Sequence, residues 1–162
     1  MNIADCLDVV RRHTDQLPVD VNAIAREMGI EVVFEEMDDN ISGAIACIDG
    51  GENYKILVNW RHPNTRQRFT IAHELGHYIY HRDLLGKGTG DTRAYRAEGT
   101  PFPNEHITWV QERQANNFAA NTLMPVPLIR RFREMGLASP SVLAPIFVVS
   151  PQAMEIRLNT VD

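Results

Sequence analysis

The sequence has little of what several common protein classes require. It contains two cysteines, Cys6 and Cys47, and no Cys-x-x-Cys pair, which argues against a cysteine-rich zinc module or a disulfide scaffold. We expect both to be buried free thiols in a reducing compartment, because disulfides are rare in the cytosol. No apolar run is long enough to cross a bilayer, so we expect no membrane association.

Basic residues and targeting features are also scarce. The chain has 16 lysines and arginines against 21 acidic residues, which gives a net charge of −5 and a pI of about 5.7. Because nucleic-acid binding depends on a basic face that neutralises phosphates, we expect no direct DNA binding. The first twelve residues lack the basic start and continuous apolar stretch of a secretory signal, which favours the cytoplasm.

Length and hydrophobic periodicity predict a single α+β domain over residues 1–162. Helical spacing, caps and breakers predict helices over 3–13, 21–28, 64–81, 105–124, 128–135, 139–144 and 152–158, the third capped by Asn64 or Thr65. Runs of β-branched residues predict strands over 30–34, 41–48 and 54–58, with the last two forming a hairpin. We expect a small antiparallel three-stranded sheet packed on the 64–81 and 105–124 helices, and a long irregular loop over 84–104.

Residues 127–162 form a C-terminal helical subregion that looks like a helix-turn-helix. Its would-be recognition helix offers Gln152, Glu155 and Arg157. With one basic and one acidic residue, this helix would bind the phosphate backbone of DNA weakly. We therefore favour packing or partner binding over sequence-specific DNA recognition.

The strongest chemical signal is the run His73-Glu74-Leu75-Gly76-His77. Histidines four residues apart project from one helix face, so both rings can reach one zinc ion. Glu74 lies beside the metal position and can take a proton from water rather than ligate. The alternative is a solvated face that carries the motif by chance. Gly76 has low helix propensity, and a close approach by another backbone would explain it.

A second helix supplies a candidate third ligand. Glu112 and Asn116 are four residues apart on a stripe whose other members are apolar, namely Trp109, Ala119, Ala120 and Leu123. A carboxylate buried there is costly unless it is paired or binds metal, so we expect Glu112 to ligate and leave one position open for water and substrate. Asn116 could orient a histidine through its outer ring nitrogen. The alternative is that Glu112 pairs with an arginine such as Arg66 or Arg113.

These segments together resemble the ImmA/IrrE-type metallopeptidases. The active-site helix of that family is similar to the run His73-Glu74-Leu75-Gly76-His77-Tyr78-Ile79-Tyr80-His81. Its second motif is similar to Glu112-Arg113-Gln114-Ala115-Asn116-Asn117-Phe118-Ala119-Ala120, followed by Leu123-Met124-Pro125. Residues 19–29 and 41–43 extend the resemblance over most of the chain. Gln114 departs from the family's usual Glu, and Asn121 stands where Glu is common.

The resemblance implies that His73, His77 and Glu112 bind one zinc ion per chain and that Glu74 is the catalytic acid and base. It also implies a cytoplasmic endopeptidase that cleaves a regulatory protein. Such a substrate would be a helix-turn-helix repressor or an antitoxin, which would place the chain in transcription regulation or a toxin–antitoxin pair.

Two other functions stay open. One is a zinc-binding interaction module with little proteolysis. The other is a different hydrolase such as a peptide deformylase, whose third ligand is a cysteine, but Cys47 lacks the flanking residues of that motif. We interpret His81 as an ordinary histidine near a helix end, and Tyr95 and His106 as weaker candidates for stabilising an oxyanion.

Overall fold

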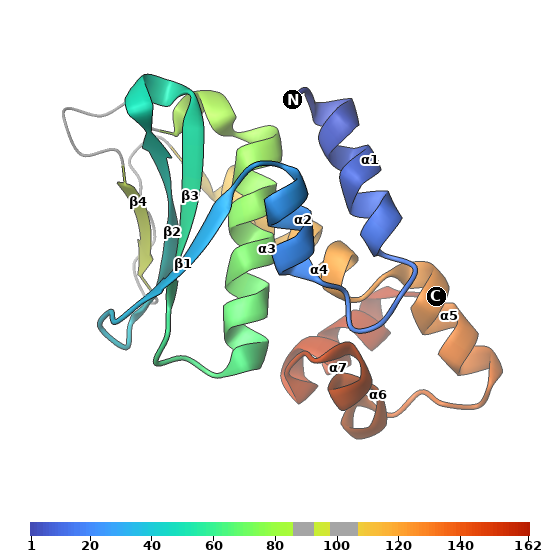
Figure 1. The fold of residues 1–162 in the computed structure, drawn as a ribbon. Coiled ribbons are helices and arrows are strands. Elements are labelled where there is room, and N and C mark those ends of the chain that lie inside the picture. The colour runs from blue at the N-terminus through green and yellow to red at the C-terminus, as the bar shows by residue number, and fades with distance from the viewer. Residues whose placement is uncertain (86–92, 98–106) are drawn as a thin grey trace.

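The computed structural model describes residues 1–85, 93–97 and 107–162, and of residues 93–97 it describes only the backbone. Its helices are α1 (Ile3–His13), α2 (Val21–Glu27), α3 (Asn64–Tyr80), α4 (Trp109–Leu123), α5 (Val126–Glu134), α6 (Pro140–Phe147) and α7 (Pro151–Thr160). Its strands are β1 (Glu31–Glu35), β2 (Ile41–Ile48), β3 (Asn53–Asn59) and β4 (Arg93–Ala97). The predicted α+β class is confirmed, and the predicted elements differ from these mainly at their ends (Figure 1).

The sheet differs from the predicted three antiparallel strands, because its order is β1-β3-β2-β4 and one pair is parallel. The predicted hairpin is confirmed, since β2 and β3 pair antiparallel from Gly43–Val58 to Ile48–Asn53. However, β1 pairs parallel with β3. Residues 36–40 reverse the chain after β1 and the β2–β3 turn reverses it again, so β3 runs in the direction of β1 and pairs with it.

The fourth strand lies in the segment that the sequence predicts as an irregular loop. β4 pairs antiparallel with the free edge of β2, with an irregular register between Ile41 and Gly43. The strand is short and lies between glycine- and proline-rich stretches. A prediction from hydrophobic alternation therefore assigns the whole segment to a loop. Those stretches, over 86–92 and 98–106, lie outside the described residues.

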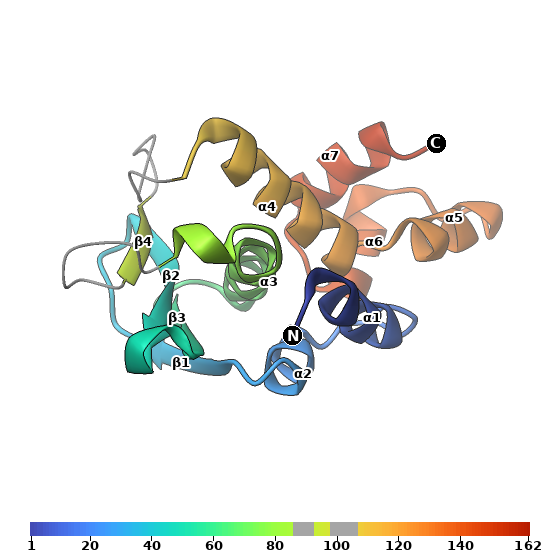
Figure 2. The same cartoon turned by 90° about the horizontal axis from the view of Figure 1, so that it is seen from above.

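Helix α3 runs through the centre of the molecule. It packs on β2 and β3 on one side and on α4 on another, while α1 and α2 contact it as well (Figure 2). Its apolar side chains enter the core, as Ile71 and Leu75 show with exposures of 1% and 0%. Its polar face is also buried, and His73 and Glu74 are only 0% and 2% exposed. The alternative of a solvated polar face is therefore wrong.

Gly76 allows α3 and α4 to approach closely. A Cβ atom at this position would lie 3.1 Å from Cα of Ala115 and 3.2 Å from Cδ1 of Phe118, both on α4. These distances are shorter than ordinary van der Waals contact. The close backbone approach predicted from the sequence is thus confirmed, and any side chain here would push the two helices apart.

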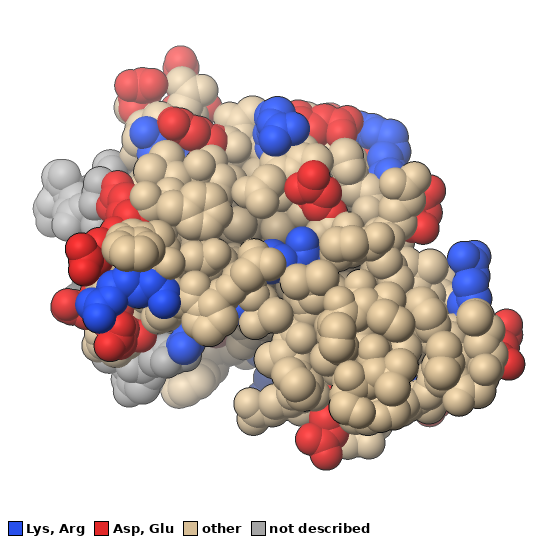
Figure 3. Space-filling model, turned by 60° about the horizontal axis from the view of Figure 1, so that its bottom comes forward, with Lys and Arg blue, Asp and Glu red and all other residues tan. Residues whose placement is uncertain are grey.

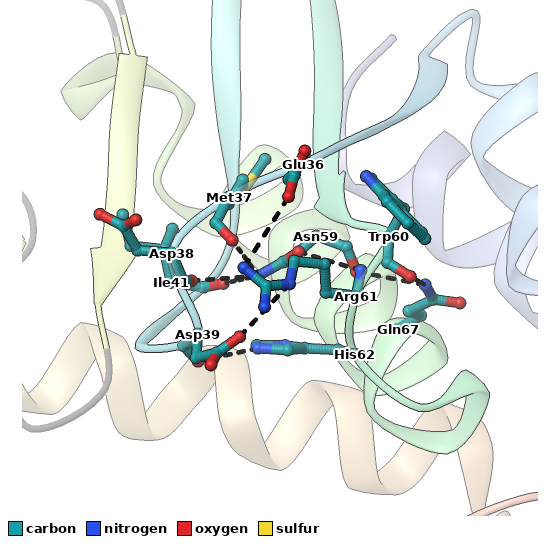
Figure 4. Close-up of polar contacts among 10 residues, drawn as sticks. All are labelled: Glu36, Met37, Asp38, Asp39, Ile41, Asn59, Trp60, Arg61, His62 and Gln67. Carbon is teal, nitrogen blue, oxygen red and sulfur yellow. Dashed lines mark hydrogen bonds and ion pairs between the residues drawn. The ribbon is translucent and has the colours of Figure 1, made fainter.

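The start of α3 is fixed in a different way from the predicted cap. Pro63 occupies the N-cap position, and no side chain there accepts a hydrogen bond from the helix. Gln67 instead donates from its side chain to the carbonyl oxygens of Asn59 and Trp60, at 3.1 and 3.2 Å. The first turn of α3 is therefore tied to the end of β3 (Figure 4).

Asn59 anchors the β1–β2 connection to this same corner (Figure 4). It is fully buried. Its amide donates to three backbone carbonyls, those of Met37, Asp38 and Ile41. Its Oδ1 accepts from the backbone N–H of Arg61 at 3.1 Å. One buried amide thus holds the two connections that place β3 and α3.

Arginine side chains hold the C-terminal helices, which form where the sequence predicts helices. They donate to carbonyl oxygens near helix ends: Arg68 to Phe147 and Val148, Arg157 to Met124, and Arg133 to Leu158 and Val161. The two cysteines are buried free thiols, as predicted. Among the helices described, none combines the length and apolar character needed to span a bilayer.

Candidate metal centre

Helices α3 and α4 bring His73, His77 and Glu112 to one point. The two histidine Nε2 atoms lie 2.9 Å apart. Glu112 Oε1 lies 3.0 Å from Nε2 of His77, and Oε2 lies 3.3 Å from Nε2 of His73. All three residues are buried or nearly so, with exposures of 0%, 2% and 9%. Together they are a group of side chains that could hold a metal ion.

The outer ring nitrogen of His73 fixes its tautomer. Its Nδ1 lies 2.8 Å from Oδ1 of Asn116, and an amide oxygen can only accept. His73 Nδ1 therefore carries the hydrogen, and its Nε2 presents a lone pair to the centre. The orienting role that the sequence predicts for Asn116 agrees with this contact.

His77 is oriented by two residues whose role the sequence interpretation missed. His81 Nε2 lies 2.9 Å from Oε1 of Gln114, and His81 Nδ1 lies 2.9 Å from Nδ1 of His77. The Gln114 oxygen accepts, so His81 Nε2 donates and the Nδ1 of a neutral His81 accepts from His77. Nε2 of His77 then also presents a lone pair to the centre.

His81 is therefore not an ordinary helix-end histidine. It is 5% exposed, and burial lowers its pKa below the usual value for histidine, which keeps the ring neutral near pH 7. Gln114, the departure from the family pattern, belongs to this same chain of hydrogen bonds. The signal that could have found His81 is its spacing of four residues from His77, whereas Gln114 is only two residues from Glu112 and shares no helix face with it.

The donor set suits a zinc ion. Two imidazole lone pairs and a carboxylate converge without an N–H between them, and they need a shared cation. Ligand atoms around a tetrahedral zinc lie about 3.3 Å apart, because the bonds are about 2.0–2.1 Å long. The observed separations of 2.9, 3.0 and 3.3 Å are close to this value.

The charge state of Glu112 also fits a ligand. Burial opposes ionisation, but the interaction with the imidazoles of His73 and His77 outweighs it and holds the pKa of Glu112 well below its usual value. The carboxylate is turned to the two histidines, which favours the metal-site alternative over the arginine pair. Trp109 does not share its buried stripe, because this side chain is 63% exposed.

Glu74 follows His73 on α3 and is buried. It stands outside the group of three that could hold the ion. The side chains of the two weaker oxyanion candidates, Tyr95 and His106, lie outside the described residues.

Changing Gln114 tests the outer hydrogen bonds. We expect Gln114→Leu to weaken zinc binding by about 10- to 100-fold, because His81 loses the acceptor that fixes its tautomer and that of His77. Gln114→Glu keeps an acceptor oxygen and should retain the affinity. Chelator competition measures the affinity, and ¹⁵N NMR of the imidazoles of the metal-free chain reads the tautomer of His77. The neighbouring exposed Arg113→Leu is the control, and equal affinities for the Leu and Glu variants would contradict the assignment.

Comparison with known families supplies an independent finding. A family model described as the IrrE N-terminal-like domain, peptidase family M78, matches residues 25–159. A comparison with curated proteins finds none that matches. The matched range includes strands β1 to β4, the helices α3 and α4 that carry His73, His77 and Glu112, and most of α7. The chain therefore belongs to the M78 peptidase family.

Proposed function

We propose that this chain is a zinc-dependent endopeptidase that acts in the cytoplasm. The observation that carries the proposal is the convergence of His73, His77 and Glu112 from two helices, with Glu74 buried next to the first ligand. This set leaves room in a tetrahedral shell for one further ligand, as catalytic zinc sites require. Membership of a peptidase family supports the same reaction class.

Each residue of the site has a separate role in the proposed hydrolysis of the peptide bond. A bound zinc ion would polarise the scissile carbonyl and acidify water. Glu74 accepts the proton of the attacking water and passes it to the leaving amine nitrogen. Asn116 holds the ring of His73, and His81 with Gln114 holds the ring of His77, so that both present Nε2 inward.

We propose a regulatory protein as the substrate, either a helix-turn-helix repressor or an antitoxin. The proposal rests on the resemblance of the two motifs to the ImmA/IrrE-type peptidases. The broad face formed by the C-terminal helices is mostly free of charged side chains (Figure 3). Such a surface suits contact with a protein better than contact with phosphates.

Incubation of the zinc-loaded chain with partner proteins tests the function. We expect it to cut a helix-turn-helix protein encoded beside it, with fragments identified by mass spectrometry, and to stop when a chelator removes the zinc. Unfolded casein serves as a general endopeptidase substrate. Stable binding of the partner with no cleavage of either protein would instead favour the zinc-binding interaction module.

A further inference from the structure

A groove separates the metal centre from the C-terminal helices. One part has a volume of about 610 Å³ and lies between α4 and α7. A second part of about 600 Å³ lies between the start of α3 and the start of α7. Both parts are lined by Phe69, Ala153 and Ile156, so they adjoin each other at these side chains. Figure 3 shows the surface hollowed between the C-terminal helices and the rest of the molecule.

Asn116 joins this groove to the metal centre. It lines the part between α4 and α7, while its Oδ1 accepts the hydrogen bond from the first ligand, His73, at 2.8 Å. The groove therefore passes one side chain away from the imidazole of His73. A polypeptide lying in it would pass on the outer, Nδ1 side of His73, with the width of the imidazole ring between it and the centre.

The walls of the groove combine apolar and amide side chains. Phe69, Met124 and Ile156 supply apolar surface, and Ile156 is 58% exposed. Asn117 and Asn121 line the same part. Amide side chains both donate and accept hydrogen bonds, so they can bond to the main chain of an extended peptide.

Arg157 gives the groove a charge preference. Its Nε donates to the carbonyl of Met124 at 3.0 Å. Its Nη2 atom is buried and has no hydrogen-bond partner among the residues that the structure describes. A guanidinium stays charged at neutral pH, and a buried charge without a counter-ion is costly. A carboxylate brought by a ligand would offset that cost through a charge-assisted hydrogen bond.

We propose that this groove is a substrate subsite that takes an apolar residue beside an aspartate or glutamate, with the acidic side chain paired to Arg157. The proposal rests on the endopeptidase function, because the occupant is the polypeptide to be cut. It names the class of sequence that the substrate carries near the scissile bond. The chain as a whole carries a net negative charge and would repel acidic peptides. We therefore expect the preference for acidic peptides to be confined to the groove.

Peptide retention tests the subsite without relying on turnover. The zinc-loaded Glu74→Gln chain is immobilised and exposed to a pool of random 12-residue peptides with amidated C-termini, and the retained peptides are sequenced by mass spectrometry. We expect peptides with an acidic residue next to an apolar one to be enriched about tenfold over the matching Asn and Gln peptides. A parallel pool with free C-termini distinguishes the side-chain carboxylate from the terminal one.

Three variants, each combined with Glu74→Gln, assign the preference to Arg157. Arg157→Gln should abolish the enrichment. Ile156→Glu should reduce it, because a carboxylate placed on this exposed position competes for the guanidinium without disturbing the core. Arg133→Gln is the matched control. Like Arg157, Arg133 donates to carbonyl oxygens at a helix end, here those of Leu158 and Val161, but it is not among the residues that line the groove. It should leave the enrichment unchanged.

The outcomes separate the two proposals. Retention without acidic enrichment, enrichment that survives Arg157→Gln, or enrichment only among free C-termini each overturns the subsite. Acidic enrichment that depends on Arg157 supports it. Cleavage of the same pool by the wild-type chain is scored separately, and its absence would overturn the endopeptidase function while leaving the binding result to stand by itself.

Discussion

Replacing Glu74 by glutamine is expected to lower kcat for peptide cleavage by about 10²- to 10⁴-fold and to leave zinc content near one ion per chain. The amide has the size of the carboxyl group, so this buried position stays filled. It cannot accept the proton of the attacking water, however, and the reaction loses its base. Initial rates on casein and metal analysis of the same sample measure the two effects.

Glu52→Gln is a suitable control for this variant. Glu52 is exposed and lies in the turn between β2 and β3, away from the α3–α4 contact, so both rate and zinc content should stay unchanged. Full activity of the Glu74 variant would show that another group acts as the base. Loss of zinc from the variant would show instead that Glu74 belongs to the ligand set.

Replacing Glu112 by glutamine should weaken zinc binding more than any change to the outer hydrogen bonds, by over about 100-fold. A neutral amide is a poor ligand, and two imidazoles alone do not complete the shell. Cleavage should be lost with the ion. Metal analysis after dialysis and chelator competition give the affinity, with the adjacent exposed Arg113→Gln as the control.

Retention of one tightly bound zinc ion by the Glu112 variant would remove this residue from the ligand set. The circular dichroism spectrum of the variant should match that of the metal-free wild-type chain. This comparison separates a lost ligand from a lost fold, because Glu112 lies on the helix that packs against Gly76.

Local periodicity explains why the centre could be predicted from the sequence. The spacing of His73 and His77 puts both on one helix face, and the cost of burying Glu112 points to its partners. The structure brings the three together as this reasoning requires. Such arguments need only the helical repeat and the polarity of each residue.

The parts that the sequence did not predict depend on how separate elements meet. The contact of His81 with Gln114 joins residues 33 positions apart, and it requires a particular rotation of α4 about its axis relative to α3. The parallel pairing of β1 depends on the β2–β3 hairpin folding between β1 and β4. The groove of Arg157 is built from α3, α4 and α7, so no single segment carries its pattern.

The glycine on α3 has a consequence for the choice of ion. Because Gly76 lets the two helix backbones touch, the spacing of the ligands is set by packing before an ion arrives. Zinc, with bonds of about 2.0–2.1 Å, fits this narrow opening. Calcium, with bonds of about 2.3–2.6 Å, would have to spread two helices that are packed against a sheet. We therefore expect the packing of α3 on α4 to favour zinc over calcium at this site.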